Sequence, residues 1–317
     1  MKRLLIIAII SSFLGCNNSG KKNTDATAES QSNSTNQAYE AISLSGDTLR
    51  SPAPSEELIA KFTTKKEAFD LDSNNIENII WHGRFTAYLG NYRDAIEIYS
   101  EAIQKYPDEP RLYRHRGHRY ITIREFDKAI ADLTRAASLI EGKENLVEED
   151  GMPNVQNIPV STLHGNIYYH LGLAYYLVDE QEAALKAFKK CLETSHNPDN
   201  VVSATHWIYM IFNKLGRKQA GENYLRNIKP GMNVIENTAY YQACLFYKGD
   251  LEQKDIYPTS GDATSSNSAL TYAFANWLYY NGYKENAGGI LKEIVAGKDW
   301  NSFGFIAAES DLARLYK

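Results

Sequence analysis

One pattern of small and large side chains recurs along this chain, and it restricts the fold more than any other feature. A small residue is followed 12 positions later by alanine, 4 further on by a large apolar residue, and 3 further on by a small or apolar residue. The first two copies are 34 residues apart. The four copies are Gly83, Ala95, Tyr99 and Ala102; Gly117, Ala129, Leu133 and Ala136; Gly172, Ala184, Phe188 and Cys191; and Ala275, Ala287, Leu291 and Ile294. A period of this length is typical of stacked helix pairs.

The residue types in the pattern explain how two antiparallel helices pack. The small residues allow close approach of the helices, and the large apolar residues fill the space between neighbouring pairs. Gly90 and Gly282 supply turns between helices. The sequence therefore predicts an all-α fold, an α-solenoid of antiparallel helix pairs that ends in a capping helix over residues 302–316. The clear repeats are expected at about residues 76–109, 110–143, 165–198 and 268–300.

In period, residue types and order, the pattern resembles the tetratricopeptide repeat family. The resemblance implies a right-handed superhelix whose first helices line a concave face, a shape that binds partners and is not built for catalysis. Some cochaperone members hold a carboxylate with a particular set of Lys and Asn residues. Ile80 and Arg84 occupy the corresponding places in the first repeat of this chain, so that specific activity is not carried over.

The first residues have the pattern of an export signal. Two basic residues precede an apolar run over residues 4–14, which is too short to span a bilayer. Residues 13–16, Phe-Leu-Gly-Cys, resemble the lipobox of bacterial lipoproteins. The resemblance implies a signal peptide over residues 1–15, a palmitate-bearing lipid anchor on Cys16 and a place in the cell envelope. Asn17 follows where Asp would favour the inner membrane, so the outer membrane is expected. The alternative is an ordinary secretory signal with a chance cysteine.

Two polar segments interrupt the apolar patterns, one between the signal and the repeats and one between the second and third repeats. Residues 16–54 contain few large apolar side chains, so they are expected to form a flexible tether to a helical domain over residues 55–317. The second and third copies are 55 residues apart, which indicates an insertion at about residues 141–161. Five acidic residues and two prolines predict an acidic, exposed loop there. Cys191 and Cys244 lie in apolar helical patterns that favour buried thiols over a disulfide.

The sequence contains no motif that would anchor catalysis. It has no phosphate-binding glycine loop, no Gly-x-Ser-x-Gly turn and no His-Glu-x-x-His helix. His164 and His170 are spaced for neither one helix face nor a zinc site. The formal charge of −5 gives no support to nucleic-acid binding. We therefore expect no enzymatic activity, no cofactor and no metal.

Polar side chains on the first helix of the second repeat form the candidate binding site. Arg111, Arg114, His115 and His118 recur at helical spacing. The repeat resemblance directs this stripe into the concave groove. Guanidinium groups bind carboxylates and phosphates, and aromatic residues add contact area. The predicted groove comprises Arg84, Tyr88, Arg111, Arg114, His118, Tyr169 and Tyr176. The alternative is a solvated helix face neutralised by the acidic insertion.

These features together predict a membrane-anchored scaffold in the bacterial cell envelope. Its concave face would bind a protein or peptide partner that carries acidic groups, and no nucleic acid. The alternative is a carbohydrate- or cell-wall-binding lipoprotein, because lipoproteins of polysaccharide-uptake systems also use this repeat with aromatic faces. An enzyme is disfavoured because no acid, base and nucleophile converge in the sequence.

Overall fold

The computed structural model describes residues 39–194, 196–257 and 268–316, which contain fourteen helices and one short β-hairpin. All of them belong to a unit that runs from Ala38 to Lys317. The predicted signal peptide, Cys16 and most of the predicted tether lie outside the described residues. The helices are α1 (Glu56–Leu71), α2 (Ile76–Tyr88), α3 (Tyr92–Lys105), α4 (Pro110–Thr122), α5 (Phe126–Leu139), α6 (Leu163–Leu177), α7 (Gln181–Thr194), α8 (Pro198–Lys214), α9 (Lys218–Leu225), α10 (Thr238–Lys248), α11 (Gln253–Ile256), α12 (Ser268–Tyr280), α13 (Lys284–Val295) and α14 (Phe303–Leu315).

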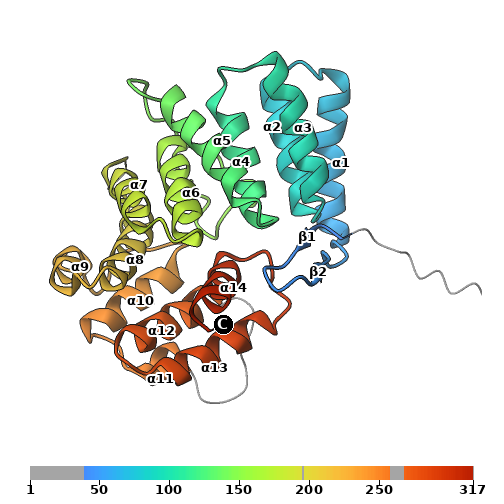
Figure 1. The fold of residues 1–317 in the computed structure, drawn as a ribbon. Coiled ribbons are helices and arrows are strands. Elements are labelled where there is room, and N and C mark those ends of the chain that lie inside the picture. Colours follow the sequence, from blue (N-terminus) through green and yellow to red (C-terminus); the bar gives the residue numbers. More distant parts are fainter. Residues whose placement is uncertain (1–38, 195, 258–267, 317) are drawn as a thin grey trace, which may run out of the picture. The chain divides into compact units, whose positions relative to one another are not determined.

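Successive helices pack against each other along the unit, from α1 in blue to α14 in red (Figure 1). The four copies of the sequence pattern coincide with the pairs α2–α3, α4–α5, α6–α7 and α12–α13, and α8–α9 forms a further pair. The prediction of an all-α stack of antiparallel helix pairs is therefore confirmed. The predicted capping helix corresponds to α14, which begins after Ser302, whose side chain accepts from the backbone N–H of Phe305.

The small residues of the pattern lie where the second helix of a pair crosses the first. A Cβ atom added to Gly172 of α6 would lie 2.7 Å from the ring of Phe188 in α7. Gly117 faces Leu133 in the same way in the preceding pair. The side chains of Phe188 and Leu133 are fully buried. The glycines thus set the distance between paired helices, as the sequence pattern predicts.

Two short strands form a hairpin before the first helix, within the segment that the sequence predicts to be a tether. Strand β1 (Ala41–Ile42) pairs antiparallel with β2 (Thr48–Leu49). Ala41 is fully buried, and the backbone N–H of Leu44 donates to Glu309 of α14 at 2.7 Å. A low apolar content predicts a tether, but this segment gains its order from contacts with the distant C-terminal helix. The predicted start of the ordered domain at residue 55 is therefore wrong, because the ordered part already includes the hairpin.

Arg124, in the turn after α4, joins that turn to the C-terminal helix. Its backbone has a φ of +67°, a conformation that few side-chain-bearing residues adopt. Its buried guanidinium donates to the Glu309 carboxylate at 2.8 Å and to the Trp300 carbonyl oxygen at 2.8 Å. Burial lowers the pKa of Arg124 although Glu309 attracts its positive charge. This ion pair links residues 185 positions apart in the chain.

The two cysteines of the helical unit are free and buried, as predicted. Burial raises the pKa of the Cys191 thiol to about 12, so it stays protonated at neutral pH. Within the described ranges, no helix is long and apolar enough to cross a membrane.

Candidate functional site

The predicted stripe on α4 begins at Arg111, and this residue is held by carboxylates of the same chain. Pro110 is the first residue of the helix, and the Glu109 side chain accepts from the backbone N–H of Arg111. The Arg111 guanidinium also pairs with Glu109 at 2.8 Å and with Glu77 of α2. The charge of Arg111 is therefore balanced at the edge of the predicted groove.

The acidic insertion lies on the middle of the stripe. A carboxylate oxygen of Glu148 is 3.2 Å from the Arg114 guanidinium, and the other is 3.6 Å from Nε2 of His115. Asn166 of α6 donates a hydrogen bond to the same carboxylate. Arg84 of α2 donates to the backbone carbonyl oxygen of Glu149 at 2.9 Å. Two residues of the predicted groove therefore already contact the insertion.

Backbone hydrogen bonds hold the insertion in this place. The N–H of Glu148 donates to the carbonyl oxygen of Ser161 at 3.0 Å, and that of Leu163 donates to Leu146 at 2.8 Å. Five of its large apolar side chains are exposed nevertheless: Leu146, Val147, Met152, Val155 and Ile158. The insertion is thus fixed at its base, and it presents apolar surface as well as the carboxylates that the sequence indicates.

The two tyrosines of α6 that sequence analysis assigns to the groove, Tyr169 and Tyr176, do not form an aromatic platform. Tyr176 is fully buried, and its hydroxyl lies 2.6 Å from that of Tyr272 and accepts from the Asn276 side chain. Its assignment to the groove is wrong, because this face of α6 packs against α8 and α12. Tyr169 is half-buried, and its hydroxyl lies 2.8 Å from that of Tyr240 and accepts from the Trp207 indole.

His118 lies next to His170 of α6 and Phe303 of α14. The ring centroids of the two histidines are 4.3 Å apart, and Phe303 lies 5.3 Å from His118. His170 donates from Nδ1 to the carbonyl oxygen of Asn166, and its Nε2 has no partner among the described residues. Burial and the nearby arginines lower the pKa of both histidines well below the usual range. Both are therefore neutral at pH 7.

Two cavities of about 370 Å³ each have His118 in their lining. One is bounded by Tyr169 and His170. The other is bounded by Tyr88 and by Arg119, which sequence analysis did not single out. Arg119 follows Arg111 by eight positions and so lies on the same helix face. Extending the stripe by one residue would have found it.

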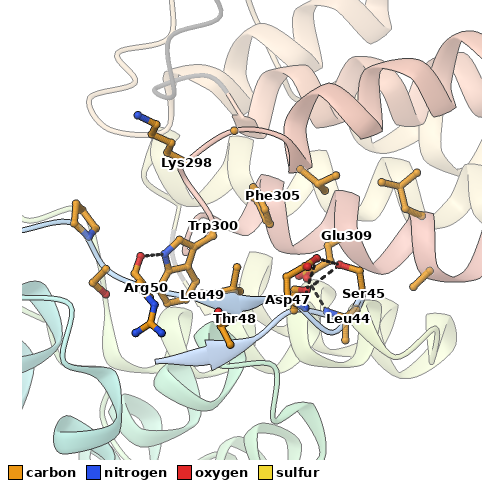
Figure 2. Close-up of a pocket in the computed structure, with 17 residues that line it drawn as sticks. Leu44, Ser45, Asp47, Thr48, Leu49, Arg50, Lys298, Trp300, Phe305 and Glu309 are labelled. Atoms are coloured by element: carbon orange, nitrogen blue, oxygen red, sulfur yellow. Dashed lines mark hydrogen bonds between the residues drawn. The ribbon is translucent and has the colours of Figure 1, made fainter. Parts of the chain in front are cut away.

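A third cavity lies between the hairpin and helices α13 and α14, with a volume of about 780 Å³ (Figure 2). Leu49, Trp300 and Phe305 supply apolar walls, and Glu309 lies at one side with Ser45 and Asp47. The Trp300 indole donates to the carbonyl oxygen of Arg50 at 2.8 Å. Sequence analysis missed this cavity, because it depends on the contact between the hairpin and the C-terminal helices.

No set of side chains in the described ranges is arranged to hold a metal ion, since no group of three or more His, Cys, Asp or Glu residues converges there. The polar residues around the stripe are instead arranged for charge-assisted hydrogen bonds. Helices α2 and α4 contribute arginine guanidinium groups, and α6 contributes tyrosine hydroxyls and an imidazole. Chemically, such an arrangement recognises anionic groups.

Comparison with known proteins identifies a tetratricopeptide repeat at residues 165–196, the segment of α6 and α7. The prediction of this repeat type is confirmed for that segment. No curated protein matches the sequence.

Three solved structures are similar to the chain. A tetratricopeptide repeat protein from Parabacteroides merdae is 16% identical, with 80% of this chain and 92% of that chain covered and a TM-score of 0.46. YrrB, described as a TPR protein with an unusual peptide-binding site, is 14% identical over 73% of this chain and 91% of its own, with a TM-score of 0.42. MamA is 20% identical over 60% of this chain and 90% of its own, with a TM-score of 0.41.

Proposed function

We propose that this protein is a lipid-anchored binding protein of the bacterial cell envelope, and that it recognises an acidic segment of a protein partner on the face formed by α2, α4 and α6. The observation that carries the proposal is the contact of Glu148 with Arg114, His115 and Asn166. An extended acidic segment already lies on this face, and it belongs to the chain itself. A partner with similar chemistry would bind by the same contacts.

The proposal assigns the insertion the role of an internal competitor. A partner carboxylate that replaces Glu148 gains the Arg114 contact only after the insertion has lost it, so the apparent affinity is reduced by the fraction of molecules in which the insertion is bound. A substitution of Glu148 that weakens its contact should therefore increase the affinity for the partner. A substitution of Arg114 should weaken binding of both the insertion and the partner. The two substitutions are expected to change the affinity for the partner in opposite directions, which would not happen if the ion pair were only structural.

Capture of partners from envelope extracts tests this assignment. With the tagged, full-length protein as bait, we expect Arg114→Glu to reduce capture of its partner about tenfold or more, because carboxylates would then face each other. We expect Glu148→Gln to increase capture. Arg135→Glu is the matched control, because Arg135 is exposed and pairs with Asp108 away from this face. A set of captured proteins that is the same for wild type and both test variants would contradict the proposal.

The lipid anchor is tested separately at Cys16. Attached acyl chains hold a protein to a bilayer in proportion to the methylene groups they bury, at about 0.8 kcal/mol for each. In the native host, we expect the wild-type protein to incorporate labelled palmitate and to sediment with the membranes. Cys16→Ala should incorporate none and should remain in the supernatant. Equal labelling of Cys16→Ala and wild type would disprove an anchor at this residue.

A further inference from the structure

Among the residues that the structure describes, Arg119 differs from the other arginines of α4 in having no carboxylate partner. Arg114 pairs with Glu148, and Arg116 pairs with Asp132 at 2.7 Å. Within the described residues, the guanidinium of Arg119 contacts the Nδ1 atom of His118 at 2.6 Å and the ring of Tyr92, whose centroid is 5.6 Å away. Neither contact supplies negative charge. A half-buried guanidinium with only neutral neighbours is costly unless something compensates its charge.

The described residues that line the cavity beside Arg119 include several hydrogen-bond donors and no carboxylate. The hydroxyl of Tyr92 accepts from the Asn301 side chain at 2.6 Å, so its own proton is available to donate. The hydroxyl of Tyr88 accepts from Arg84 at 3.4 Å and has its proton available in the same way. The guanidinium and two phenolic hydroxyls are a donor set for an oxyanion.

The rest of the cavity wall is partly apolar, and it also includes the polar residues Thr122 and Asn301. Leu58, Ala87 and Met152 come from α1, α2 and the insertion. They would contact the carbon atoms next to the charged group of a ligand. A volume of about 370 Å³ has room for a carboxylate with a short apolar substituent.

The charge in the cavity selects among oxyanions. Arg119 provides one positive charge, and His118 accepts from Arg119 through Nδ1 and is neutral at pH 7. A carboxylate carries one negative charge and matches this environment. A phosphate monoester carries close to two and would leave charge uncompensated in a partly buried site.

We propose that the Arg119 cavity binds a carboxylate attached to a short apolar group, with Arg119, Tyr88 and Tyr92 as its hydrogen-bond donors. The carboxylate has two possible sources, the C-terminus of a peptide or a free organic acid. This inference extends the proposed function. It rests on that function only where the ligand is taken to come from a protein partner. The site uses residues other than the Arg114–Glu148 contact, so it can be tested alone.

Small probes test the site in the full-length protein. Arginine side-chain N–H signals are followed by NMR during titration with one probe at a time. The probes are N-acetyl-leucine, N-acetyl-leucinamide, hexanoate, a tripeptide ending in leucine, the amide of that tripeptide and inorganic phosphate. We expect N-acetyl-leucine to bind with a dissociation constant of about 1 mM, as suits a ligand of its size. The two amides should bind at least about tenfold more weakly, because they lack the charge.

Variants identify the residues responsible. Arg119→Gln is expected to weaken N-acetyl-leucine about tenfold or more, and Arg119→Lys less, because lysine keeps the charge but loses the planar donor pair. Tyr92→Phe keeps the ring contact with Arg119 and removes only the hydroxyl, so it should also weaken binding. It tests the site independently if Arg119→Gln fails to fold. Arg217→Gln is the control, because Arg217 is exposed and pairs with Glu182 of α7.

Each outcome either supports or overturns the proposed carboxylate site. Binding of hexanoate but not of the tripeptide would support the site with a free acid as its ligand, and the reverse would support a peptide C-terminus. Equal binding of acid and amide, tighter binding of phosphate, full affinity in Arg119→Gln or no saturable shift with any carboxylate would overturn the proposal. Probe binding with an unchanged set of captured proteins in Arg114→Glu would leave the site standing and contradict the proposed function instead.

Discussion

Replacing Glu309 by glutamine is expected to lower the free energy of unfolding by about 3–5 kcal/mol. The Arg124 guanidinium has Glu309 as its carboxylate partner, and the two side chains are 3% and 6% exposed. Glutamine has nearly the same shape, so the substitution removes the charge and leaves the packing. The guanidinium would then be buried without a counter-charge, in a residue whose φ of +67° already makes its backbone unfavourable. Urea unfolding of the purified protein measures the effect.

Two further variants separate the charge from other causes. Asp108→Asn breaks the Arg135–Asp108 pair, whose side chains are 45% and 82% exposed, and should cost at most about 1 kcal/mol. Arg124→Met combined with Glu309→Leu removes both charges, and it should be more stable than Glu309→Gln alone. If Glu309→Gln and Asp108→Asn have the same small effect, the Arg124–Glu309 pair does not stabilise the fold.

Replacing Gly172 by alanine should destabilise the protein by about 1–3 kcal/mol. In most helices this substitution is favourable, because alanine has a higher helix propensity than glycine. At Gly172 the added methyl group would lie 2.7 Å from the ring of Phe188, which is fully buried and stacks on Trp207. The ring has little room to move, so α6 and α7 must separate. The change in the urea midpoint at constant slope reports this loss.

Gly289 of α13 is the matched control. It is also a helical glycine, but a Cβ atom there meets no atom within 4 Å. Gly289→Ala should therefore stabilise the protein by up to about 1 kcal/mol, through helix propensity alone. The two identical substitutions are expected to have opposite signs. Destabilisation by both, or by neither, would mean that close approach of α6 and α7 does not depend on Gly172.

Local patterns explain why the helix pairs could be predicted from the sequence. Gly117 and Leu133 are only 16 positions apart, and their sizes follow from one contact between neighbouring helices. The same holds for Gly172 and Phe188. The start of α1 after Ser55 is equally local, because the Ser55 side chain accepts from the backbone N–H of Leu58. A feature that depends on contacts within one helix turn or one helix pair can therefore be predicted from the spacing of residues in the sequence.

Contacts between distant segments explain what could not be predicted. The order of the hairpin depends on Leu44 meeting Glu309, and neither residue has a sequence signal that indicates the other. Tyr176 resembles a groove residue by its place in the repeat, but Tyr272 and Asn276 of α12 enclose it. The sequence indicates that an acidic insertion exists. Its charge allows it to neutralise the stripe, as the alternative interpretation holds, but no spacing indicates that Glu148 is the residue that reaches Arg114.

The bond from Leu44 to Glu309 spans 265 positions, and it gives the last helix a neighbour from the opposite end of the chain. Linear repeat arrays fray at their ends, because a terminal repeat has a neighbour on one side only. Helix α14 contacts α12 and α13 on one side and the hairpin and Arg124 on the other. Unravelling from the C-terminus must therefore also break a contact that closes a loop of 265 residues. We expect the last helix to fray less than the terminal helix of an array with a neighbour on one side only.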